Sequence, residues 1–215
     1  MEQLDNPFKK AGLVLLIVGI LDIGVMIYCI MNQINYGSSF NIFAVIAGIL
    51  LMKGGVKTAR VVRWFSAFLA IAFIGFFILS PLLIPIDLRM TQFKLNPIEV
   101  LSSYASTIIL IGVLIWVYMQ LSMPNALAKL EEAGYKIQRP KSALYTALVF
   151  IILGGASLGF ILNSGPAKKA ELLAQKQFGS NYKYHVANLS FANDHGVAIV
   201  TAYNDNEIKN VQVQW

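Results

Sequence analysis

The sequence predicts a polytopic α-helical membrane protein with a small C-terminal α+β domain. Of its 215 residues, 57% are hydrophobic and 13% are charged, whereas a soluble domain has about 45–50% apolar and about 25% charged residues. The mean hydropathy is +0.63, which excludes a disordered chain, because disorder requires low hydrophobicity. The apolar residues collect in long runs, and only the C-terminal quarter alternates between apolar and polar residues.

Five apolar runs are candidates for membrane spans, since the hydrocarbon core of a bilayer needs about 20 helical residues. They cover residues 11–31, 40–56, 64–84, 98–121 and 143–162. The second run is the weakest, because its apolar part ends at Met52 and it reaches spanning length only with residues 54–56. It predicts either a fifth span or a short tilted or re-entrant segment.

Lysine and arginine lie mostly on one side of these runs. Ten of them fall in residues 1–10 or in the links after the second and fourth runs, and only Arg89 and Lys94 fall in the opposite links. Because cytoplasmic loops are rich in Lys and Arg, we expect a bacterial inner-membrane protein with a cytoplasmic N-terminus and a periplasmic C-terminal domain. Five lysines in that domain oppose this orientation, but a terminal tail is weaker evidence than short loops. Charges that flank apolar runs do not form the basic face of a nucleic-acid-binding domain.

One cytoplasmic link contains a predicted short helix over residues 124–133. Pro124 stands at its start and Gly134 follows its end, which is the usual placement of these two residues. Leu127, Leu130 and Ala133 share one face. The helix is expected either to lie on the cytoplasmic headgroups or to dock a cytoplasmic partner.

The tail, residues 164–215, predicts a helix followed by a three-stranded antiparallel meander. The helix covers residues 167–178 and ends at Gly179. The first strand alternates up to Val186 and then changes phase at Leu189, which indicates a β-bulge. A turn at residues 193–196 and a second turn at 204–206 separate the strands. Trp215 is in phase with the buried face of the last strand.

This tail resembles the small domain of the cytochrome oxidase assembly factor 1 type. The resemblance covers residues 164–215 and rests on a membrane helix, a short linker, a helix ending in a glycine, and strands with the sequences Gly196-Val197-Ala198-Ile199-Val200 and Val211-Gln212-Val213. It implies an assembly or accessory role without catalysis. The four preceding apolar runs are additional to the single membrane helix of that family.

Asp22 is the ionisable residue deepest in a predicted span, the twelfth of 21 residues in the first run. An exposed charge near the bilayer centre costs at least about 2.5–3.5 kcal/mol. One interpretation is an interhelical hydrogen bond, and the other is a proton or cation site in a translocation path. The structural interpretation suggests four partners: Asn41, Ser102, Tyr104 and Thr107.

Two further groups of residues are candidates for contacts in the membrane. Gly155 and Gly159 form a small-xxx-small stretch, which allows close packing within the bundle or against another subunit. Arg60, Arg63 and Trp64 are expected to anchor their helix at the interface, with the arginines extended to the lipid headgroups. A specific site for an anionic lipid is the alternative.

The sequence offers no catalytic, metal or cofactor motif. Its two histidines, His185 and His195, both lie in the tail, so no membrane helix supplies a pair of haem ligands. A metal site there would need a third ligand from Asp194 or Asp205. We therefore expect neither an enzyme nor a cofactor.

The leading hypothesis is a non-enzymatic accessory, assembly or scaffold subunit of a bacterial inner-membrane complex. Its partners would be the lipid bilayer and other membrane-protein subunits, the latter bound through the exported C-terminal domain, and nucleic acid is not expected. One alternative is a small transporter or channel that uses Asp22. Another is a membrane-resident immunity protein whose exported domain captures a toxin.

The charge bias makes the topology testable. An alkaline phosphatase reporter fused after Trp215 should be active, because the enzyme folds only outside the cytoplasm, and the same reporter fused at Gly55 should be inactive. Activity is measured in whole cells, with the abundance of each fusion as the control. The reverse pattern would contradict the orientation, and activity at both positions would remove the second run from the spans.

Overall fold

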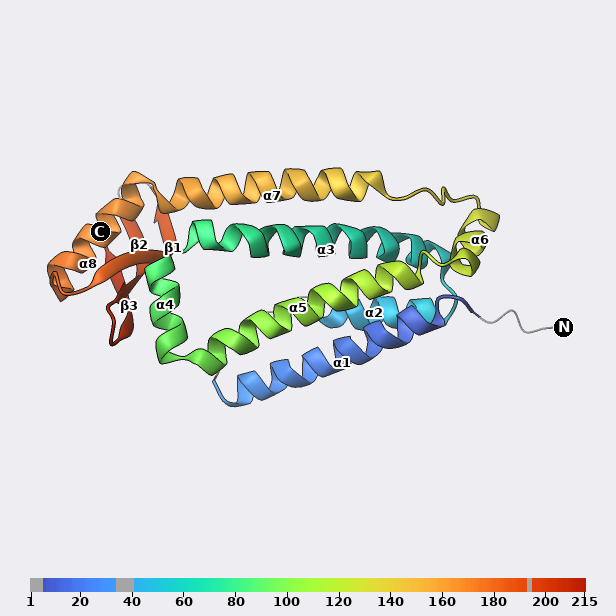
Figure 1. Ribbon diagram of the computed structural model, residues 1–215, viewed down its shortest axis with the longest axis horizontal. Helices are drawn as coiled ribbons and strands as arrows, with labels where there is room; N and C mark the ends of the chain where they lie inside the picture. Colours follow the sequence, from blue (N-terminus) through green and yellow to red (C-terminus); the bar gives the residue numbers. More distant parts are fainter. Residues whose placement is uncertain (1–5, 34–40, 193–194) are drawn as a thin grey trace. The chain divides into compact units, whose positions relative to one another are not determined.

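The computed structural model describes residues 6–33, 41–192 and 195–215, which form eight helices and three strands. Four of these helices are long and apolar enough to cross a membrane: α1 (Lys9–Met31), α3 (Val56–Leu83), α5 (Pro97–Gln120) and α7 (Lys141–Leu162) (Figure 1). At most 17% of the most apolar window of each helix is buried. A helix that is hydrophobic all round and yet exposed is typical of a membrane span. The predicted fold class is confirmed.

The second apolar run forms the short helix α2 (Asn41–Met52), which has 12 residues. At about 1.5 Å per residue it is about 18 Å long, against a hydrocarbon core of about 30 Å. The described residues therefore contain four helices of spanning length, one fewer than the number of apolar runs in the sequence. Of the two interpretations of the second run, the short segment fits this length.

Helix α2 lies against the first half of α1 with almost no space between the two backbones (Figure 1). A Cβ atom built on Gly48 would lie 2.7 Å from the carbonyl oxygen of Gly12, and one built on Gly12 would lie 2.8 Å from the carbonyl oxygen of Gly48. The Asn6 side chain donates from Nδ2 to the carbonyl oxygens of Leu51 and Met52, at 2.9 Å each. These carbonyls end α2 and have no partner within the helix. The start of α1 and the end of α2 therefore lie together.

Two compact units make up the chain, residues 1–71 with 110–147 and residues 72–109 with 148–215. In the first unit, helix α6 (Pro124–Glu132) joins the ends of α1, α2, α3 and α5 around one apolar cluster. This basal cluster consists of Phe8, Ala11, Leu15, Leu51, Ala59, Val117, Leu121, Ala126 and Leu130. The ten cations that the sequence places on one side of the spans all lie on the segments that meet here. We call this part of the first unit the basic end.

The second unit contains a helix that the sequence analysis missed. Helix α4 (Ile86–Leu95) forms where a link between spans was expected. Pro85 precedes it, Asp87 lies in its first turn and Lys94 in its last turn, an order of charges that complements the helix dipole. Leu88 and Thr91 are its buried residues.

The C-terminal domain consists of α8 (Gly165–Phe178), β1 (Lys183–Ala192), β2 (His195–Tyr203) and β3 (Ile208–Gln214). The strands pair antiparallel in the order β1-β2-β3, and the register shifts between Val186 and Asn188. The predicted meander and its bulge are both confirmed. Ser164 caps α8 by accepting the backbone N–H of Ala167 at 3.3 Å, and Gly179 ends the helix with a φ of 88°, a left-handed conformation that favours glycine.

One face of the sheet packs against α8 (Figure 1). The contact is made by three alanines of the helix and five residues of the strands: Ala167, Ala170, Ala174, Val186, Ala198, Val200, Val211 and Val213. The larger apolar side chains Leu172 and Phe178 are 58% and 45% exposed. Alanine lets the helix backbone come close to the sheet, so three alanines form the fully buried part of α8, and Leu173 is partly buried against the same cluster.

The α1–α2 contact predicts a sharp difference between two glycines. Replacing Gly48 by alanine should destabilise the protein by about 1–3 kcal/mol, because the new methyl group meets backbone atoms that can move only if the helices separate. Gly24→Ala is the matched control, since Gly24 has no described neighbour within 4 Å and alanine favours a helix. The measurement is the thermal unfolding midpoint in mild detergent. An equal rise of the thermal midpoint in both variants would contradict the close contact between α1 and α2.

Candidate functional site

A cleft of about 560 Å³ lies between α4 and the loops of the C-terminal domain, both in the second unit. Two contacts cross it. Lys183 forms an ion pair with Asp87 of α4, and Lys94 Nζ donates to the carbonyl oxygen of Asp205 at 3.0 Å. The hydrogen bond to Asp87 raises the pKa of Lys183. Both members of the ion pair are exposed, so the pair contributes little stability.

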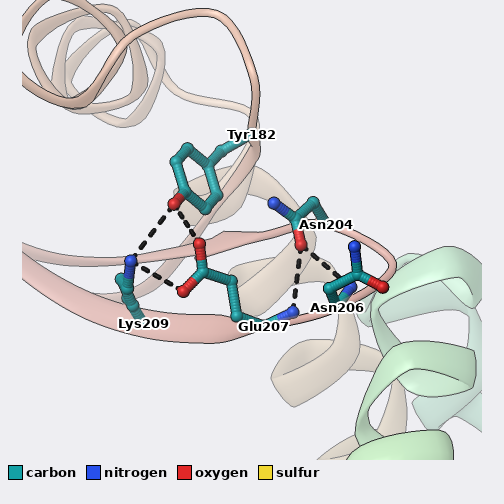
Figure 2. A network of polar contacts seen from close by, with 5 residues as sticks. All are labelled: Tyr182, Asn204, Asn206, Glu207 and Lys209. Carbon is teal, nitrogen blue, oxygen red and sulfur yellow. Dashed lines mark hydrogen bonds and ion pairs between the residues drawn. The ribbon is translucent and has the colours of Figure 1, made fainter.

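Next to this cleft, polar side chains at the β2–β3 turn form a connected network (Figure 2). The Tyr182 hydroxyl donates to Glu207 Oε1, and Lys209 Nζ lies 3.1 Å from the Tyr182 oxygen and 2.7 Å from Glu207 Oε2. Asn204 Oδ1 accepts the backbone N–H groups of Asn206 at 2.9 Å and of Glu207 at 3.0 Å. Such an Asx turn fixes the backbone of a short loop.

The protonation states in this network suit structure better than catalysis. Hydrogen bonds from Lys209 and Tyr182 lower the pKa of Glu207, and the bond to Glu207 raises the pKa of Lys209. Both groups therefore stay charged at neutral pH, whereas a general acid or base works best with a pKa near the operating pH. The network holds the turn in one geometry.

The sheet face opposite α8 carries a second candidate site, which we call the outer sheet face. Its centre is formed by Val197 and Ile199 of β2, which are 40% and 39% exposed. The strand register places four uncharged polar residues directly opposite these two: Asn188, Ser190, Gln212 and Gln214. The sequence already contained a clue to this surface, because residues 196–200 are apolar or glycine in both phases of the alternation.

Asp22 is partly buried and stands 14th among the 23 residues of α1. Three of its suggested partners make other hydrogen bonds: Ser102 and Thr107 donate to carbonyl oxygens of α5, and Tyr104 accepts from Arg89 at 3.0 Å. The side chain of the fourth, Asn41, lies outside the described part of the chain. The structural and the transport interpretations of Asp22 both remain predictions.

Two of the three predicted anchor residues lie at the surface of the basic end. The Trp64 indole N–H donates to Ser142 Oγ at 2.9 Å, and its ring stacks on Phe68 at a centroid distance of 5.4 Å. Arg60 is exposed, with its guanidinium 4.9 Å from the centre of the Tyr135 ring. Both positions are compatible with an interfacial anchor.

Arg63 departs from the predicted extension towards the lipid headgroups, because it is only 6% exposed. Its Nε donates to Ser122 Oγ at 2.9 Å and its Nη2 to the carbonyl oxygen of Ile137 at 3.3 Å. The guanidinium carbon lies 5.9 Å from the centre of the Tyr118 ring. The end of α5 and the link that follows α6 cover this side chain, and neither contact could be inferred from the sequence of α3 alone.

The two predicted packing glycines of α7 have different surroundings. A Cβ atom on Gly155 would lie 3.3 Å from Leu79 of α3, whereas Gly159 has no described neighbour within 4 Å. Two other glycines have closer neighbours: a Cβ atom on Gly154 of α7 would lie 2.8 Å from Phe76, and one on Gly75 of α3 would lie still closer to Ile151. A role of Gly159 in contact with another subunit stays a prediction.

The tail histidines lie apart from any described cluster of ligands. His185 is half-buried in β1, where burial lowers its pKa, and His195 is exposed at the start of β2. Asp194, a suggested third ligand, lies outside the described residues. Among the residues that are described, no three His, Cys, Asp or Glu side chains are grouped to hold a metal ion.

Comparison with known proteins returned no match: no family model, no curated protein and no solved structure is similar to this chain.

The burial of His185 predicts that the C-terminal domain loses stability in acid. Because the folded state lowers the pKa of this residue, the unfolded chain, with a pKa of about 6.5, binds the proton more readily. The stability of the folded protein should therefore fall as the pH drops below about 6.5 towards the folded pKa. His185→Gln should abolish the loss of stability that comes from protonation of this residue. The measurement is the thermal midpoint of the full-length protein in detergent at several pH values. His195→Gln is the control, and an equal effect of both changes would contradict the assignment.

Proposed function

We propose that the protein is a non-enzymatic accessory or assembly subunit of a bacterial inner-membrane complex, and that its outer sheet face binds a protein partner. The observation that carries this proposal is the composition of β2. Val197 and Ile199 are exposed on one face, while Ala198 and Val200 are buried against α8 on the other. An antiparallel strand with one solvated face normally alternates apolar and polar residues, and a strand that is apolar on both faces is typical of one covered on both sides.

The residues around this apolar centre also favour a protein partner. The side chains opposite Val197 and Ile199 are amides and a serine, and charged residues are depleted at the core of protein interfaces while polar residues form the rim. The nearby ionic groups Glu207 and Lys209 are engaged with each other and with Tyr182. Both features support binding rather than catalysis.

The charges and the contacts of α4 support the proposed placement of the domain. Ten cations gather at the basic end, which supports a cytoplasmic position for it. Helix α7 then leads out of the cytoplasm to a periplasmic C-terminal domain. Contacts of Lys183 and Lys94 tie this domain to α4, between the spans α3 and α5. These contacts support a position of the domain at the membrane surface, within reach of another membrane protein. The resemblance to the assembly-factor domain separately implies an assembly or accessory role.

Site-specific crosslinking tests this proposal. A photoreactive amino acid at Ile199 should crosslink a defined membrane-protein partner in living cells. The same amino acid at Phe178, an apolar residue of α8 with similar exposure, is the matched control and should not. Ile199→Lys should weaken binding of that partner about tenfold or more, because a buried apolar contact of about 1.4 kcal/mol or more is lost.

The readouts are the identity of the crosslinked protein, its co-purification in mild detergent, and the amount of assembled complex in cells. Ile199→Lys should reduce the assembled complex without changing the abundance of this protein, and Phe178→Lys should leave both at the wild-type level. Equal crosslinking from both positions, or a normal amount of complex in the Ile199 variant, would count against the outer sheet face as the binding surface.

A further inference from the structure

The basic end contains an unusual feature: a buried guanidinium that has no carboxylate partner among the described residues. Arg63 is 94% buried, given its 6% exposure, and in the part of the chain that the structure describes it forms no ion pair. Its two protein partners, a serine hydroxyl and a backbone carbonyl, are both neutral. Buried charges are normally paired, because removing an ion from water without a counter-ion is costly. The charge of Arg63 therefore calls for an anion.

A cavity of about 450 Å³ lies next to this side chain. It is lined by Arg63 together with Tyr118, Ser122, Leu127, Ile137 and Arg139. Two guanidinium groups thus border one cavity, and neither forms an ion pair within the described residues. The repulsion between two like charges falls when an anion lies between them.

We infer that this cavity binds a phosphate oxyanion, which Arg63 and Arg139 contact directly. A guanidinium has five N–H groups in a planar fork that matches phosphate oxygens. Arg63 uses two of them for Ser122 and Ile137, so three remain for a ligand. The bond to Ser122 and the Tyr118 ring hold the guanidinium in place before the ligand arrives.

The location of the cavity connects this oxyanion with the membrane. Arg63 lies near the start of α3, and Tyr118 and Ser122 lie at or just after the end of α5, and both helices are of spanning length. The ends of such helices lie at the depth of the lipid headgroups. Leu127 and Ile137 give the cavity an apolar part that suits the glycerol region of a phospholipid. The same oxyanion chemistry would also accept free phosphate, so the test contains an arm for each source.

Ligand-dependent stabilisation of the full-length protein tests the site. The protein is purified in an uncharged detergent, freed of lipid, and titrated with short-chain phosphatidylglycerol, short-chain phosphatidylcholine or inorganic phosphate while its thermal midpoint is followed. Phosphatidylglycerol should raise the midpoint at lower concentrations than phosphatidylcholine does. Arg63→Gln should raise the half-maximal concentration of phosphatidylglycerol roughly tenfold or more, since a hydrogen bond to a charged group is lost.

Lys57→Gln is the matched control, because Lys57 is an exposed cation on the same helix outside the cavity, and its loss removes the same net charge. It should leave the half-maximal concentration within about twofold, since exposed charges are screened. If Arg63→Gln does not fold, Arg139→Gln replaces it, because Arg139 is exposed and lines the same cavity.

Each outcome bears on the proposal. Stabilisation by phosphatidylglycerol that depends on Arg63 or Arg139 supports the site with a lipid headgroup as its ligand. Arginine-dependent stabilisation by inorganic phosphate at least as strong as that by the lipid supports the site with free phosphate as its ligand. Stabilisation by the phospholipids that is unchanged in the arginine variants, equal losses in the Lys57 and arginine variants, or no stabilisation by any ligand would overturn it.

Discussion

The structure depends on one constraint: within hydrocarbon, every backbone N–H and C=O group needs a partner inside the protein. Four helices satisfy this constraint because each is long enough to cross a bilayer with its backbone groups hydrogen-bonded within the helix. Helix α2 is too short to do so; the Asn6 side chain binds its terminal carbonyls, and Gly12 and Gly48 let it pack closely on α1. Apart from Asp22 in α1 and its suggested partners, the polar groups discussed above lie at the basic end or in the C-terminal domain with its neighbour α4.

Features encoded within a short stretch of sequence could be predicted. A span follows from the length of an apolar run, and the meander from strand periods separated by turns. The bulge in β1 was visible because the apolar phase changes between Val186 and Leu189. Features that the sequence did not predict depend on contacts between residues far apart in the chain. Which residues of α8 are buried depends on how closely the helix approaches the sheet, and this distance favours alanines over Leu172.

The burial of Arg63 and the helix α4 could not be predicted for the same reason: both depend on residues that are distant in the sequence. Arg63 meets partners 59 and 74 residues away in the sequence, so its burial cannot be derived from its own helix. Helix α4 makes contacts with residues 96 and 111 positions away, and its apolar residues do not all lie on one face. In contrast, the sequence of β2 does indicate the outer sheet face, because the residues that point to either side of this strand are apolar. It becomes interpretable only once α8 is seen to cover one of the two faces.

The two proposed binding surfaces would bind their ligands by different interactions, ionic at the cavity and apolar at the sheet. The cavity at Arg63 combines charge with neutral partners, so its occupant is selected by charge and hydrogen-bond geometry. Part of that attraction, contributed by the surrounding exposed cations, weakens as salt screens them. The outer sheet face presents Val197 and Ile199 among uncharged amides, so its binding energy comes from apolar burial, which screening leaves unchanged.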